Sequence, residues 1–242
     1  MAWSHKGHLV VGRECGIDVL DDKDEFKVIK SVDITGRAFS VVPYKTDLII
    51  AIHPQIKRST TTFVTWNREY EETRRWVANV DASDITIANH QIIVSSQAST
   101  NLKRFTLAGN ILPDIEWDGE SAGIVGLPSA TIAFADPKRC TVHRKLIGER
   151  LSDVLWTVDV IKPFAMCVDD DGCLWVRSNK YDCLTLISPQ GIKIQDIMGE
   201  QMMTADERRN PNNWFGMRVH NGYLYIGHDD GVGRYELSYD SV

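Results

Sequence analysis

Six short segments of the sequence resemble one another and recur along the whole chain. Each is rich in β-branched or aromatic residues and ends at a polar residue, which is typical of a buried β-strand. Their first residues are 40, 43, 40, 42 and 50 positions apart. The segments span residues 8–13, 48–53, 91–96, 131–136, 173–178 and 223–228. A repeat of this length restricts the chain to architectures in which similar units pack on one another.

Each segment is predicted to be the second strand of a larger antiparallel unit. Asp171-Gly172 and Asn221-Gly222 are strong hairpin signals because both pairs tolerate positive φ. Preceding strands are expected over 39–42, 85–88, 164–168 and 215–219. Third strands are expected over 16–20, 61–66, 102–107, 141–146, 184–188 and 232–237. Fourth strands are expected in four of the units, over 26–32, 75–80, 153–160 and 192–197.

These units predict an all-β fold, a single six-bladed β-propeller of four-stranded antiparallel blades over residues 1–242. The blades are placed at about 1–34, 35–81, 82–118, 119–160, 161–198 and 212–242. Residues 199–211 are expected to form a surface excursion with a turn of helix. A stacked pair of β-sandwiches is the alternative, but it would not explain so regular a period.

Closure of the ring is left open by the sequence. Residues 1–4 align with the innermost strand of the first blade, and only 238–242 follow the third strand of the last. Propellers usually close when one terminus completes the blade of the other. Either the last blade has three strands, or a strand upstream of Met1 is missing.

Composition excludes several classes of protein. Hydrophobic residues make up 43% of the 242 residues and charged residues 25%, as in a folded soluble domain. The net charge of −6 argues against a generally basic nucleic-acid binder. No apolar run is long enough to span a membrane, and residues 1–6 show no signal peptide, so a cytoplasmic location is expected, with a nuclear protein or a piece of a longer chain as alternatives.

The five cysteines give no metal-binding pattern, because no C-x-x-C pair occurs. Cys167 and Cys173 flank a predicted hairpin turn, so a cross-strand disulfide is one alternative. Two buried thiols in a reducing compartment are the favoured interpretation.

Two blades resemble a known repeat. Residues 163–178 followed by 184–191 resemble an NHL repeat, with a proline, an apolar strand, acidic residues with glycine, and a strand with an aromatic residue and valine. Residues 214–237 are a weaker match. The chain is most similar to the divergent NHL-like propellers of invertebrate tripartite-motif (TRIM) proteins. That resemblance implies that the chain recognises protein or RNA. It also implies that the chain is the substrate-recognition domain of a larger protein. Ubiquitin transfer would need a RING domain, which this chain lacks.

Catalysis is not expected. Enzymatic six-bladed propellers hold a metal with Glu, Asp, Asn or His from their innermost strands. The predicted innermost strands carry no carboxylate and no histidine, and Arg218 is their one charge. We therefore expect no cofactor, no metal and no catalytic residue. A small-molecule hydrolase or lyase with a channel metal is the remaining enzymatic alternative. The seven histidines do not converge, although His53 and His228 share a face of non-adjacent blades.

Binding is expected on one face of the propeller, here called the loop face. It carries the loops between second and third strands and the connections between blades. The candidate partner-binding residues are Arg13, His53, Lys57, Arg58, Lys138, Arg139, Lys180, Tyr181, Arg208, Arg209, Trp214 and His228. Lys57, Arg58, Lys138, Arg139 and Lys180 form a predicted basic arc.

The connections between blades are mostly acidic, and their carboxylates would weaken phosphate binding. A protein or peptide partner is therefore favoured over RNA, for which Tyr181 and Trp214 could provide stacking. No membrane partner is expected. Five further tryptophans are predicted to pack between blades rather than to bind ligands: Trp66, Trp76, Trp117, Trp156 and Trp175.

Overall fold

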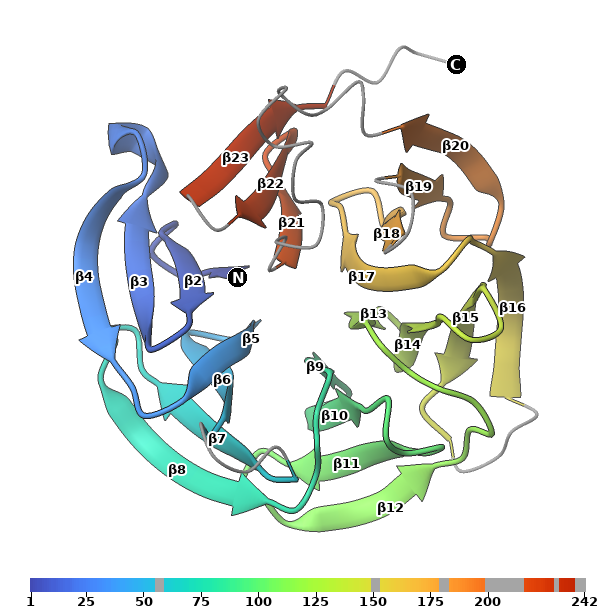
Figure 1. The fold of residues 1–242 in the computed structure, drawn as a ribbon, viewed down its shortest axis with the longest axis horizontal. Coiled ribbons are helices and arrows are strands. Elements are labelled where there is room, and N and C mark those ends of the chain that lie inside the picture. The colour runs from blue at the N-terminus through green and yellow to red at the C-terminus, as the bar shows by residue number, and fades with distance from the viewer. Residues whose placement is uncertain (55–58, 149–152, 179–182, 199–215, 229–230, 238–242) are drawn as a thin grey trace.

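A computed structural model of the chain describes residues 1–54, 59–148, 153–178, 183–198, 216–228 and 231–237. These residues form six antiparallel sheets arranged in a ring, with the first strand of each sheet at the centre and the last at the rim (Figure 1). The all-β six-bladed propeller is therefore confirmed. Five blades have four strands, and the last has three among the described residues.

The strands follow one another in chain order from the centre to the rim of each blade. Blade 1 contains β1 (Ala2–Trp3), β2 (Leu9–Arg13), β3 (Gly16–Asp21) and β4 (Lys27–Asp33), with the 3-10 turn η1 (Asp22–Asp24) before β4. Blade 2 contains β5 (Arg37–Tyr44), β6 (Asp47–His53), β7 (Thr61–Trp66) and β8 (Glu72–Ala78). Blade 3 contains β9 (Asp84–Ala88), β10 (Gln91–Ser95), β11 (Leu102–Thr106) and β12 (Ile111–Ile115).

The second half of the ring repeats this order. Blade 4 contains β13 (Ile124–Leu127), β14 (Thr131–Asp136), β15 (Thr141–Leu146) and β16 (Val154–Asp159). Blade 5 contains β17 (Pro163–Val168), β18 (Leu174–Ser178), β19 (Cys183–Ile187) and β20 (Lys193–Met198). Blade 6 contains β21 (Gly216–His220), β22 (Tyr223–His228) and β23 (Gly231–Glu236).

Blade 3 has a fourth strand, β12, that the sequence pattern does not predict. Pro113 lies within it, and proline is normally excluded from a strand because it has no N–H to donate. β12 is at the rim, and its pairing with β11 shifts register between Leu102 and Arg104, opposite the segment that contains Pro113. A bulged strand at the edge of a sheet tolerates proline.

The core of the molecule lies between the blades. Six clusters of buried apolar side chains each join two neighbouring blades, including blades 6 and 1. Packing of tryptophan between blades is confirmed: Trp66, Trp117 and Trp175 are buried, and Trp76 and Trp156 are half-buried within these clusters.

Two fourth strands reach the next blade in the same way. Trp76 on β8 lies against Gly109 of blade 3, where a Cβ would come within 2.7 Å of the indole. Trp156 on β16 lies against Gly191 of blade 5 and donates from Nε1 to the carbonyl of Pro189 over 3.2 Å. Both glycines lie in turns between third and fourth strands and have positive φ, so a side chain there would be strained as well as blocked.

Ring closure depends on side chains in the described structure, because β1 pairs with β2 and no strand is shared between blades 1 and 6 among these residues. Trp3 stacks on His220 with ring centroids 4.4 Å apart and meets Tyr225 edge-on at 5.1 Å. Phe26, which lies between η1 and β4 of blade 1, also contacts Tyr225. Aromatic packing therefore joins the first blade to the last.

None of the five cysteines forms a disulfide. Cys167 lies opposite Trp175 in the β17–β18 ladder rather than opposite Cys173, so this register does not favour a disulfide between the two cysteines. No helix in the described part of the chain is long and apolar enough to cross a membrane.

Candidate functional site

A cavity of about 290 Å³ opens on the loop face between blades 3 and 4. Its walls come from the segment after β10, the connection between the two blades, and the turn after β14. The lining residues are Gln97, Ala98, Ser99, Thr100, Asp118, Gly119, Glu120, Asp136, Lys138 and Arg139. We call this cavity the loop-face pocket. Its size suits one or two side chains of a bound chain rather than a large cofactor.

The turn at one wall is fixed by Asp136, the last residue of β14, whose side chain is fully buried. Its Oδ1 accepts hydrogen bonds from the backbone N–H groups of Lys138 and Arg139, over 3.1 and 2.9 Å. A buried carboxylate with several donors is well satisfied and holds the turn in one conformation. The direction in which Lys138 and Arg139 leave the backbone is thus set by a single residue.

Arg139 is held by carboxylates within the protein. Its guanidinium pairs with Asp118 and with Asp136, and it lies 5.2 Å from the ring centroid of Trp117. The hydrogen bond with Asp118 is the main reason that the pKa of Arg139 is raised. This side chain joins blade 4 to the connection from blade 3, so its charge is largely neutralised before any partner binds.

Gly119 allows the connection to lie directly on this cluster. A Cβ at this position would come within 2.2 Å of Asp136 Oδ2 and 2.7 Å of Trp117 Nε1. Only glycine permits such an approach of backbone to side chain. The wall of the pocket is therefore closely packed beneath Gly119.

Two charged side chains of the pocket have no ion pair with another described residue. Lys138 is exposed in the turn after β14, and Glu120 is half-buried on the connection between blades 3 and 4. A lysine and a glutamate on a fixed frame can bind a segment that carries both charges, through rim ion pairs and hydrogen bonds. The pocket has the mixed charge that the sequence predicts for the loop face.

The structure separates the other described candidates from this pocket. Arg13 pairs with Asp18 and Asp33 of its own blade, at 3.2 and 2.6 Å, so its charge is already compensated. His53 is half-buried, and its ring stacks on Phe39 with centroids 4.1 Å apart. Both residues therefore have structural contacts within or next to their own blades.

Most of the predicted basic arc lies outside the described residues. His228 is the last residue of β22, but its side chain is not described. Seven candidates lie outside the described residues: Lys57, Arg58, Lys180, Tyr181, Arg208, Arg209 and Trp214. The predicted excursion over 199–211 also lies outside them.

The expectation that the innermost strands carry no carboxylate and no histidine is wrong. β9 begins at Asp84, one residue before its predicted start, and β21 ends at His220. Asp84 accepts hydrogen bonds from Ser40 Oγ at 2.7 Å and from the backbone N–H of Ile124 at 3.2 Å. It therefore joins blade 2, blade 3 and blade 4 at the wall of the channel. The sequence pattern placed the start of this strand at residue 85, so Asp84 was left outside the innermost strand.

The surroundings of Asp84 act on its carboxyl in opposite directions. Burial raises the pKa of Asp84, and the hydrogen bond from Ser40 and the positive charge of Arg218 partly offset that rise. Arg218 lies on β21, across the channel from blade 3 in the ring order. Within the described residues, no group of three or more His, Cys, Asp or Glu side chains is placed to hold a metal ion.

Replacement of Asp84 by alanine is expected to lower the free energy of unfolding by about 2 kcal/mol, because it leaves Ser40 and two backbone donors without their acceptor. Urea unfolding followed by fluorescence measures the change. Asp159→Ala removes an exposed carboxylate from β16 and should change stability by less than about 0.5 kcal/mol. Equal effects of the two variants would show that Asp84 does not join the blades.

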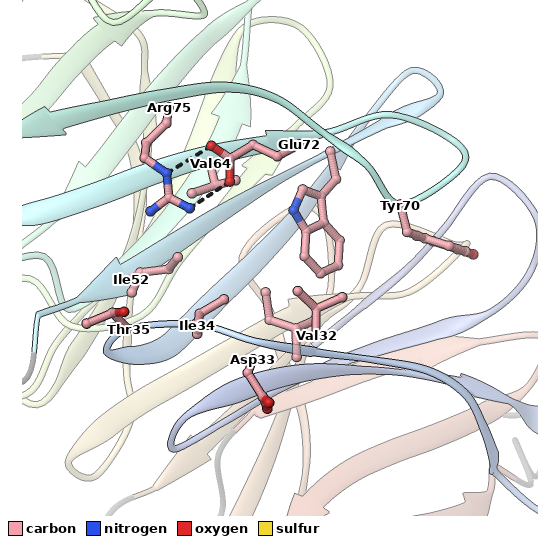
Figure 2. A pocket seen from close by; sticks show the side chains of 11 residues that line it. Val32, Asp33, Ile34, Thr35, Ile52, Val64, Tyr70, Glu72 and Arg75 are labelled. Carbon is pink, nitrogen blue, oxygen red and sulfur yellow. Dashed lines mark hydrogen bonds and ion pairs between the residues drawn. The ribbon is translucent and has the colours of Figure 1, made fainter.

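A second cavity, of about 240 Å³, lies between blades 1 and 2 (Figure 2). Its inner wall is formed by apolar residues of the core cluster between these blades, including Ile17, Ile52 and Trp66. Glu72 and Arg75 form a two-bonded ion pair at 2.6 and 2.9 Å, as the dashed lines in Figure 2 show. This pair lowers the pKa of Glu72. Since Glu72 and Arg75 satisfy each other, this cavity is a less suitable binding site than the loop-face pocket.

Solved structures share the fold of this chain. A chain from a crystal structure of a nidogen/laminin complex is 12% identical, with a TM-score of 0.72 over 95% of this chain and 89% of that one. Hsv2 of Kluyveromyces lactis is 14% identical, with a TM-score of 0.56 over 97% and 72%. Virginiamycin B lyase from Staphylococcus aureus is 15% identical, with a TM-score of 0.54 over 96% and 75%.

These similarities establish the propeller fold alone, since the fold hosts both binding proteins and enzymes. No protein-family model matches the chain, and no curated protein matches it in sequence. The resemblance to NHL repeats of tripartite-motif proteins therefore rests on the sequence segments given above.

Proposed function

We propose that this chain is a non-enzymatic interaction module that binds an extended segment of a protein partner in the loop-face pocket. The proposal rests on one observation: a rigid pocket wall carries one basic and one acidic side chain that are not paired with each other. Asp136 and Arg139 fix the pocket wall, while Lys138 and Glu120 face the same cavity without an ion pair to another described residue. A segment with an acidic residue near Lys138 and a basic residue near Glu120 would complement it.

RNA fits this pocket less well. Phosphate binding needs a positive field, and Asp118, Glu120 and Asp136 surround the two basic residues. Arg139 is already paired with two of these carboxylates. RNA recognition by the same face is the alternative function, and it would depend on basic residues other than Arg139.

The wider role follows from the sequence resemblance. NHL-like propellers of tripartite-motif proteins recognise other macromolecules, so we propose this chain as the recognition domain of a larger protein of that type, in the cytoplasm. Five cysteines without a disulfide fit a reducing compartment. The similarity to a chain from a nidogen/laminin complex supports protein binding. Because virginiamycin B lyase has the same fold, a small-molecule hydrolase or lyase with a channel metal remains the second alternative.

Selection of a random linear peptide library on the purified chain tests the proposal. Enriched peptides are expected to carry an acidic and a basic residue, and Lys138→Glu should weaken their binding about tenfold by placing like charges together. Reversal of the peptide's acidic residue to lysine should restore binding to that variant. Fluorescence anisotropy of labelled peptides measures both effects.

Lys45→Glu is the matched control, because Lys45 is exposed in the hairpin between β5 and β6, on the face opposite the loop face. It makes the same change of charge and should leave peptide binding unaltered. Peptides that bind the two variants equally well would contradict the proposed pocket. Tighter binding of single-stranded RNA pools than of any peptide, lost in high salt, would favour the RNA alternative.

A further inference from the structure

Among the described residues, blade 6 ends at the rim with a third strand, whereas the other five blades each end with a fourth. In those blades the fourth strand runs antiparallel to the third and contains five to seven residues. Among the described residues, nothing pairs with the outer edge of β23. Figure 1 shows β23 at the rim, between the outer strands β20 and β4.

The register identifies the backbone groups at this edge. Leu237 donates its N–H inward to the carbonyl of Gly222 over 2.8 Å, and β23 pairs with β22 without a register shift. Residues of an antiparallel strand alternate between inward and outward hydrogen-bonding groups. Val232, Arg234 and Glu236 therefore present their N–H and C=O groups outward, where a further strand would pair.

The complete blades show what a fourth strand contributes. Its apolar residues pack against the next blade. At three interfaces, one large side chain also contacts the turn between the third and fourth strands of that next blade. Trp76 and Trp156 do so at two interfaces. Lys30 on β4 does so at a third, where its Nζ donates to the carbonyl of Tyr70 over 2.9 Å.

The corresponding turn next to blade 6 is acidic. It follows Asp21, the last residue of β3 in blade 1, and contains Asp24 and Glu25, of which Asp24 pairs with Lys27 at 3.2 Å. Phe26, which follows it, contacts Tyr225 of blade 6 with ring centroids 6.1 Å apart. A strand added to blade 6 would thus bring its large residue toward Asp21 and Glu25, carboxylates that have no ion pair with another described residue and favour a lysine or arginine.

We propose that the outer edge of β23 accepts an extended strand from a separate protein, which completes blade 6. This strand runs antiparallel to β23, spans five to seven residues, alternates apolar with polar side chains, and carries a lysine or arginine that reaches the acidic turn of blade 1. Strand addition at an exposed sheet edge derives affinity from main-chain hydrogen bonds and specificity from alternate side chains. This site is distinct from the loop-face pocket and does not depend on it.

The chain's own β4 supplies a probe with this pattern. A labelled synthetic peptide of residues 26–35 carries Lys30, Val32 and Ile34, the side chains that contact blade 2 in the intact protein. It is expected to bind the purified chain in an anisotropy titration. Backbone amides of Val232, Arg234 and Glu236 should exchange quickly by NMR in the free chain and slowly with the peptide bound.

Arg234→Pro is the decisive variant, because proline at an outward position removes an edge N–H without breaking the inner ladder. It should weaken peptide binding about tenfold relative to Arg234→Ala, which keeps the N–H. A peptide with Lys30→Glu should bind about tenfold more weakly than the original. Lys138→Glu should leave this binding unchanged, so failure here and failure at the loop-face pocket are separable.

Three results would overturn the proposal. Slow exchange of the three edge amides in the free monomer would show that the chain covers this edge itself. A dimer in solution with the same protected amides would identify a second copy as the occupant. Equal peptide binding by Arg234→Pro and Arg234→Ala would place the peptide elsewhere.

Discussion

Replacement of Tyr225 by alanine is expected to lower the free energy of unfolding by about 4 kcal/mol, the range found when a buried aromatic ring is removed from a packed core. The Tyr225 side chain is 2% exposed and packs against Trp3 and Phe26 of blade 1. Its cluster also contains Leu9 and Leu20. The loss falls on the one interface in which the first and last blades meet without a shared strand in the described structure. Urea unfolding at neutral pH measures it.

Leu155→Ala is the control for Tyr225→Ala, since Leu155 is a large apolar residue of β16 that is 50% exposed. It should cost less than about 1 kcal/mol, because most of its surface contacts water in the folded protein. A small effect of Tyr225→Ala would mean that closure depends on another part of the chain. A large effect, with a lower dependence of unfolding on urea, would show that the open ring retains partly folded blades.

The architecture could be predicted because its signals are local and repeated. Six similar strands at near-constant spacing identify the blades, and the structure confirms them. Gly172, Asn221 and Gly222 have positive φ, as the hairpin signals require. Each such signal lies within a few residues of the strand that it specifies.

Features that depend on neighbouring blades could not be predicted in this way. The fourth strand of blade 3 is absent from the sequence prediction, and Pro113 within it is tolerated only because the strand lies at the rim. Asp84 falls one residue before the predicted strand over 85–88, although it is the first residue of an innermost strand and contacts Ser40 and Ile124, which lie 44 and 40 positions away. Such partners are not visible in a local pattern.

The candidate site was predicted as a face but not as a set of contacts. Lys138 and Arg139 both lie at the loop-face pocket, as expected for residues in a loop after a second strand. Their roles differ because Asp118, on the connection from blade 3, pairs with Arg139 and leaves Lys138 exposed. The sequence placed the acidic connections on the same face but could not show which carboxylate meets which base.

His143 is the strongest example of a residue whose role depends on burial. It is 6% exposed on β15, its two ring nitrogens lie 2.7 and 2.9 Å from the hydroxyls of Thr141 and Thr157, and its ring packs on Trp117. Burial lowers the pKa of His143 to about 4; Asp136 opposes that shift and Arg139 adds to it. The imidazole is therefore neutral in the folded protein at pH 7.

This shift predicts acid sensitivity of the folded state. An unfolded histidine titrates near its ordinary pKa of about 6.5, so between about pH 6.5 and 4 the unfolded chain binds a proton that the folded chain does not. Stability from His143 is complete above that window and is lost as the pH falls through it. The expected loss is about 3 kcal/mol, measured as the change in the free energy of unfolding between pH 7 and pH 4.

His143→Gln separates this residue from the carboxylates that also titrate in acid. Glutamine cannot take up the proton but can still exchange hydrogen bonds with a threonine hydroxyl, so the variant should lose about 3 kcal/mol less than wild type over the same window. His90→Gln removes an exposed histidine and should keep the wild-type pH dependence. A parallel pH dependence in all three proteins would mean that His143 does not control acid stability. A smaller loss of stability in acid for His143→Gln alone would show that protonation of this ring controls acid stability. Because His143 packs on Trp117, which contacts Arg139, protonation would then also affect the wall of the loop-face pocket.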